Sequence, residues 1–73
     1  MTGEYKDIAQ LLYKLRKEKR MSQMVLADKS GYTPAYISKV ENGIKVPTMT
    51  AAEDLFGALG YKIKFVVELE AEK

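Results

Sequence analysis

The side chains that this sequence offers for chemistry are cations, hydroxyls, amides and carboxylates, because its 73 residues include neither cysteine nor histidine. Without these two residue types, zinc fingers, thiol nucleophiles, imidazole bases and most transition-metal sites are excluded. The ten carboxylate side chains stand in no catalytic motif. The sequence therefore predicts a binding protein rather than an enzyme, with no catalytic residues, no metal and no cofactor.

The most informative polar stretch is residues 22–43, SQMVLADKSGYTPAYISKVENG. Ser22 is a good N-cap for a short helix, and Gly31 supplies the left-handed conformation that ends it. Thr33 can cap a second helix, in which Pro34 fits the first helical position. The stretch therefore predicts two short helices joined by a tight turn.

The second of these helices has one inward edge and a clear end. Leu26 and Ala27 face inward from the preceding helix, and Ile37 and Val40 do so from this one. Asn42-Gly43 ends it, because both residues tolerate positive φ. Two helices joined in this way form a helix-turn-helix, and in a small basic domain that motif is typical of major-groove DNA recognition.

The charge distribution agrees with a polyanionic partner. The net charge is only +2, but residues 1–47 carry nine Lys/Arg against five Asp/Glu, and residues 48–73 carry three against five. A basic front and a mildly acidic back suit a domain that turns one face toward nucleic acid.

Two further helices are expected around the motif. Before the motif, Ile8, Leu11, Leu12 and Leu15 fall at helical spacing and form an apolar stripe. Tyr5 lies one turn earlier on the same face. Late in that helix lies a basic surface, which consists of Lys14, Arg16, Lys17, Lys19 and Arg20. This surface is either a solvated face or a source of one or two phosphate contacts. After the motif, Thr48 caps a helix that Gly60 ends, with an apolar face of Met49, Ala52, Leu55, Phe56 and Leu59. Gly57 inside it is expected to mark the close approach of another helix.

The last segment changes to the two-residue period of a β-strand, with apolar side chains at Tyr61, Ile63, Phe65, Val67 and Leu69. A lone strand leaves backbone groups unpaired and therefore needs a partner. The simplest partner is the same strand of a second copy, paired antiparallel in a homodimer. A strand packed flat on its own helices, or a tail ordered by another protein, are the alternatives.

These features predict an all-α bundle of four or five helices followed by one dimerising strand. We expect a helix-turn-helix domain at residues 1–60, a dimerisation strand at 61–69 and a flexible tail at 70–73. No segment resembles a signal peptide or is apolar enough to span a bilayer. A cytoplasmic, nucleoid-associated protein with no membrane partner is expected.

From Ile8 to Leu59 the sequence resembles the Cro/cI-type helix-turn-helix family, also called the Xre family, whose fold is lambda-repressor-like. The matching residues are Leu15-Arg16, Ser22-Gln23, Leu26-Ala27, Gly31, Ile37-Ser38, Glu41-Asn42-Gly43, Pro47 and Ala58-Leu59-Gly60. More loosely, the C-terminal strand resembles that of short antitoxins and regulators, HipB-like proteins among them. The resemblance implies a structural ion pair between Arg16 and Glu41.

The resemblance also implies which residues touch DNA. Phosphate contacts are expected from Gln23, Asn42 and Lys45. For Tyr32, in the turn, two readings stay open: a contact with the DNA backbone, or a plain surface aromatic. The base-reading positions of the family fall here on Thr33, Pro34, Ala35, Tyr36, Ser38 and Lys39. Lys39 can donate to guanine, whereas Ala35 and the Thr33 methyl can touch a thymine methyl. Pro34 and Ala35 replace polar side chains of many relatives, so DNA shape is expected to contribute to discrimination.

The resulting hypothesis is a dimeric transcriptional repressor that reads an inverted repeat in double-stranded DNA through residues Pro34–Asn42. Two alternatives stay open. One is the antitoxin of a toxin–antitoxin pair, which binds a toxin protein and represses its own operon. The other is an interaction or bridging module that keeps the fold but no longer binds DNA.

Overall fold

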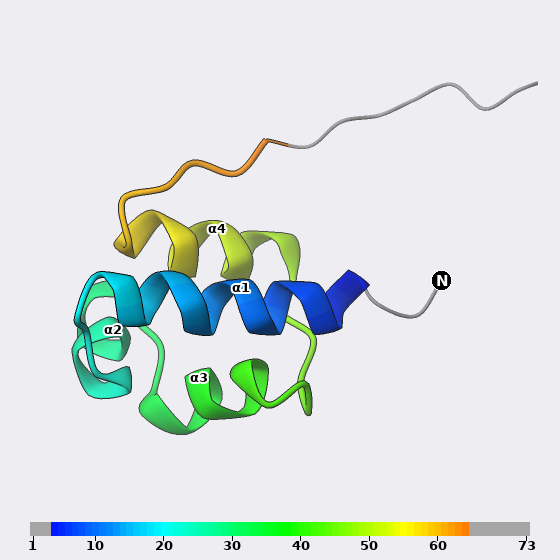
Figure 1. Ribbon diagram of the computed structural model, residues 1–73, viewed down its shortest axis with the longest axis horizontal. Coiled ribbons are helices and arrows are strands. Elements are labelled where there is room, and N and C mark those ends of the chain that lie inside the picture. Colours follow the sequence, from blue (N-terminus) through cyan, green and yellow to red (C-terminus); the bar gives the residue numbers. More distant parts are fainter. Residues whose placement is uncertain (1–3, 65–73) are drawn as a thin grey trace, which may run out of the picture.

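The computed structural model describes residues 4–64, with side chains from Ile8 onward, and these residues form four helices (Figure 1). They are α1 (Glu4–Glu18), α2 (Gln23–Ser30), α3 (Pro34–Glu41) and α4 (Met49–Ala58). In the view of Figure 1, α3 and α4 lie on opposite sides of α1, and α2 closes one end of the bundle. The predicted all-helical bundle is therefore present in the described part of the chain, with four helices.

The helix boundaries follow the capping signals of the sequence. The side-chain oxygens of Ser22, Thr33 and Thr48 each accept a hydrogen bond of 3.0 Å from the backbone N–H three residues later. Gly31 ends α2 at a φ of 84°, where its N–H donates to the Ala27 carbonyl at 2.9 Å. These caps satisfy groups that a helix end leaves without an intrahelical partner. The predicted boundaries of the helix-turn-helix are confirmed.

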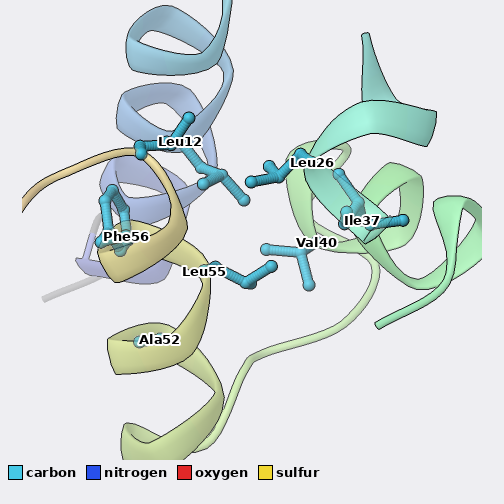
Figure 2. Packing of buried hydrophobic residues seen from close by; sticks show 9 residues of the cluster. Leu12, Leu26, Ile37, Val40, Ala52, Leu55 and Phe56 are labelled. Atoms are coloured by element: carbon cyan, nitrogen blue, oxygen red, sulfur yellow. The ribbon is translucent and has the colours of Figure 1, made fainter. Parts of the chain in front are cut away.

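The core lies where all four helices meet. Its fully buried side chains are Leu12, Leu26, Ile37, Val40, Leu55 and Leu59. Figure 2 shows Leu12, Leu26 and Leu55 pointing toward one another, with side chains of α3 closing the cluster. Ala27 is also buried, and this small side chain lets α2 approach its neighbours closely. The core thus fixes α3 from its inner edge and leaves its outer edge free for binding.

Two residues predicted to face inward do not. Leu11 is 46% exposed and Met49 is 61% exposed. Leu11 lies at the outer edge of the α1 stripe, where it lines an open apolar cavity instead of the core. Met49 is the first residue of α4, one turn before the helix reaches the core at Ala52. Both predictions were wrong because helical periodicity gives the direction of a stripe but not its width.

The predicted C-terminal strand stays a prediction. Residues 61–64, the last of the described part of the chain, belong to no helix or strand. Ile63 packs against the core cluster, and the Lys19 ammonium lies 5.4 Å from the centre of the Tyr61 ring. Phe65, Val67, Leu69 and the tail at 70–73 lie outside the described residues, as does the side chain of Tyr5.

Gly57 is not a close-approach site. A Cβ atom built on it meets no described atom within 4 Å, and its φ is not positive. Alanine therefore adds helix propensity without a clash, and Gly57→Ala is expected to raise the free energy of unfolding by about 0.5–1 kcal/mol and Tm by about 2–8 °C. Thermal unfolding followed by circular dichroism measures the shift.

Gly43→Ala is the matched control, since a Cβ there also meets no described atom within 4 Å but φ is +74°. Strain in the left-handed region should make this variant less stable by about 1–2 kcal/mol. Equal shifts in the two variants would contradict the backbone argument.

Candidate nucleic-acid interface

A buried ion pair joins α1 to the end of α3. Arg16 donates from Nε to Glu41 Oε2 at 2.7 Å and from Nη2 to Glu41 Oε1 at 3.0 Å. The side chains are only 6% and 4% exposed. The hydrogen bond to Glu41 raises the pKa of Arg16 above its usual value, against the opposing effect of burial, so the guanidinium stays charged. Arg16 therefore belongs to the interior and not to the basic surface that the sequence predicted for α1.

The same pair also forms hydrogen bonds with the loop before α2 and with the first residue of α2. Arg16 Nη1 donates to the Met21 carbonyl at 2.7 Å, and Gln23 Nε2 donates to Glu41 Oε1 at 3.1 Å. We refer to Arg16, Met21, Gln23 and Glu41 as the Arg16 network. It fixes the start of α2 against the end of α3, the two elements from which DNA contacts are expected.

The outer face of α3 carries the residues predicted to read bases. Thr33, Pro34, Ala35 and Lys39 are exposed, whereas Tyr36 and Ser38 are half-buried. Thr33 caps the helix and Pro34 begins it, so Thr33, Pro34 and Ala35 lie at its start, whereas Lys39 lies in its last turn. Ile37 and Val40 on the inner edge are buried. The six base-reading candidates thus extend along α3 from its N-cap to its last turn, away from the buried edge formed by Ile37 and Val40.

The candidate phosphate contacts lie at the other end of α3 and at the start of α2. Asn42 caps α3, and its side-chain nitrogen donates to the Ser38 carbonyl at 2.9 Å. The exposed Lys45 follows on a loop whose backbone N–H groups bond back to the Lys39 carbonyl. Gln23 is half-buried, and its amide nitrogen donates to Glu41. The Val25 N–H already donates to the Ser22 side chain, so the backbone N–H groups of Gln23 and Met24, which have no acceptor in the preceding turn of a helix, are the ones that suit an anion there.

Tyr32 has a partner that the sequence did not indicate. Its hydroxyl donates to Asp54 Oδ2 on α4 at 2.9 Å. Its ring stacks on that of Tyr36, with centroids 5.0 Å apart and planes inclined by 21°. Tyr32 and Asp54 are 22 residues apart and in different elements, so neither periodicity nor a motif could have paired them. Asp54 is the residue near the predicted site that sequence reasoning missed.

Other kinds of site are not found in the described residues. No group of three or more His, Cys, Asp or Glu side chains there could hold a metal ion. No helix among residues 4–64 is long and apolar enough to cross a membrane.

The Arg16 network generates a stability prediction. Removing the Glu41 carboxylate leaves a buried guanidinium without its partner, so Glu41→Ala should lower the free energy of unfolding by about 3–5 kcal/mol. Urea unfolding measures the loss. Glu41→Gln keeps the shape and a hydrogen-bond acceptor and should lose less. A loss below about 1 kcal/mol in Glu41→Ala would contradict an ion pair held in the interior.

The Tyr32–Asp54 hydrogen bond generates a pH prediction. This bond raises the pKa of Tyr32 above the ordinary 10.0, and burial and the Asp54 charge act in the same direction. The folded state then holds the phenolic proton more tightly than the unfolded state, so the stabilisation is complete below pH ~10 and is lost as the pH rises through the folded pKa. The wild type should therefore lose more stability than Tyr32→Phe in alkaline urea titrations. Parallel losses would contradict the bond.

Comparison with known proteins identifies the family. The chain is 28% identical over 60 residues to an immunity repressor protein of Bacillus phage phi105, a stretch that covers 82% of this chain and 42% of that protein. The chain thus spans less than half the length of this curated relative. No solved structure matches this chain. The family described as helix-turn-helix matches residues 12–66, which contain the whole of α2, α3 and α4. This chain belongs to the helix-turn-helix family of the Cro/cI (Xre) type, a family of DNA-binding transcription regulators.

Proposed function

We propose that this chain is a dimeric transcriptional repressor that places α3 in the major groove of double-stranded DNA. The observation that carries the proposal is the outer face of α3, where six candidate contact residues are gathered on an element held by its inner edge and by the Arg16 network. A rigid helix with one free face is the geometry that major-groove reading requires.

Phosphate contacts would set the docking of α3. The first turn of α2 offers backbone N–H groups beside Gln23, and Lys45 offers an ammonium on the loop after α3. Contacts on both sides of a reading helix fix its register on the duplex without carrying sequence information. Since each contact releases counterions from the DNA, affinity should fall steeply with salt.

Base reading would rest on few hydrogen bonds. Lys39 is exposed on α3 and can donate to guanine O6 and N7. Pro34 and Ala35 offer only apolar contacts, Ala35 to a thymine methyl. Ser38 is half-buried, and its hydroxyl lies 3.3 Å from the Asn42 side-chain nitrogen. Sequence-dependent DNA shape is therefore proposed to supply part of the discrimination.

A homodimer would present two such helices to an inverted repeat whose half-sites are about one helical turn (~34 Å) apart. An apolar cavity of about 360 Å³ between α1 and α4, lined by Leu11, Phe56 and Ile63 among others, supports an assembly at this side of the bundle. It adjoins the segment that leads toward the predicted strand. In Figure 1 that segment and α3 lie on opposite sides of α1, so pairing there would leave α3 free.

The protein would act in the cytoplasm. It would repress transcription by occupying a promoter. The similarity to an immunity repressor protein supports repression rather than activation. The antitoxin alternative predicts an apolar surface around Val25, and Val25 and Met24 on α2 are 43% and 70% exposed. Continued DNA binding and regulation by a Lys39→Ala, Gln23→Ala double variant would overturn reading through α3, and with it the repressor proposal.

The proposed phosphate contact of Lys45 gives a direct test. Lys45→Ala should weaken binding to any duplex and reduce the slope of log affinity against log salt by ~0.9, because one fewer counterion is released. Fluorescence anisotropy of a labelled duplex over a series of salt concentrations measures the slope. Lys62→Ala is the control, since Lys62 is also an exposed lysine but lines the cavity between α1 and α4. Equal slopes for the two variants would contradict the proposed docking.

A further inference from the structure

Two tyrosines form a single unit at the start of the recognition helix. Tyr32 lies in the turn between α2 and α3, and Tyr36 lies in the first turn of α3, where its N–H donates to Thr33. Their rings are stacked and both are half-buried against the core cluster. A stacked aromatic pair is a rigid shape that presents area at low cost in conformational entropy.

The position of this pair depends on a residue outside the helix-turn-helix. The Tyr32 hydroxyl donates to Asp54 on α4, so the Tyr32 ring is held at its hydroxyl end while its face stacks on Tyr36. Asp54 itself is exposed. The hydrogen bond also occupies the hydroxyl proton of Tyr32, which would otherwise be available to a DNA phosphate.

We propose that Asp54 is a positioning residue for sequence discrimination: through Tyr32 it fixes the Tyr36 ring at the DNA-facing start of α3. This inference rests on the proposed function. It assigns to α4 a role in specificity, beyond the support of the core. Because Pro34 and Ala35 offer no hydrogen bonds from their side chains, the shape of this aromatic unit carries discrimination that polar side chains would otherwise supply.

Two consequences separate positioning from a general effect of charge. Losing the Asp54 acceptor should lower the ratio of specific to non-specific affinity, because Tyr36 is no longer held in one orientation. Losing a negative charge near DNA should raise affinity for all duplexes alike, since phosphates are then repelled less. The first effect belongs to Asp54 alone, whereas the second belongs to any acidic residue close by.

The experiment compares Asp54→Ala with Glu53→Ala, its exposed acidic neighbour on α4. Affinities for a duplex selected by the wild type and for a scrambled duplex are measured by anisotropy. Asp54→Ala and Tyr32→Phe are each expected to lower the affinity ratio about two- to tenfold, the worth of one hydrogen bond. Glu53→Ala should leave the ratio unchanged. Asp54→Asn keeps an acceptor and should retain the ratio. Wild-type ratios in both Asp54→Ala and Tyr32→Phe would overturn the proposal.

A second measurement does not depend on DNA. In the free protein, the Tyr36 ring-proton NMR shifts should move in Asp54→Ala and stay in place in Glu53→Ala. Unmoved Tyr36 resonances in Asp54→Ala would overturn the positioning role, even where the wild type discriminates between duplexes. If the wild type binds no duplex, the proposed function fails instead, and the NMR comparison still decides whether Asp54 positions Tyr36.

Discussion

The buried pair of Arg16 and Glu41 is the interaction on which the arrangement of this domain depends. Two opposite charges in a largely apolar interior are stable only when all their hydrogen-bonding groups are satisfied. Here the partners come from four places: the guanidinium from α1, the carboxylate from α3, a carbonyl from Met21 and an amide from Gln23. These bonds are made together in the observed placement of the helices. The pair therefore contributes registration more than stability, and it places the start of α2 and the end of α3 at a fixed separation.

That registration divides the domain into a fixed interior and an adaptable face. The inner edge of α3 is held by Ile37 and Val40, and its C-terminal end by Glu41. Its N-terminal end is held by the Tyr32–Tyr36 stack, which Asp54 anchors from α4. With both ends and one edge fixed, the outer side chains can vary without altering the fold. A family with this division can change its DNA target by exchanging a few exposed residues.

Local signals in the sequence predicted the elements well, and contacts between distant residues were harder to predict. Ser22, Gly31, Thr33 and Thr48 set helix ends by hydrogen bonds over three or four residues, so their effect can be read from the chain. The pairing of Arg16 with Glu41 was predicted from the resemblance to a known family and not from a local pattern. Tyr32 with Asp54, and Gln23 with Glu41, depend on how helices dock, which no local pattern records. The exposure of Leu11 and Met49 was missed because helical periodicity gives the direction of an apolar stripe but not its width.

Whether two copies of α3 read a symmetric DNA site can be decided by selection from a random duplex library. The purified protein would be used at two salt concentrations, because phosphate-driven binding weakens with salt while base-specific preferences persist. If two copies of α3 read the site, an inverted repeat with half-sites about one helical turn apart should be enriched. Recovery of unenriched sequences, with binding that only fades as salt is raised, would contradict it.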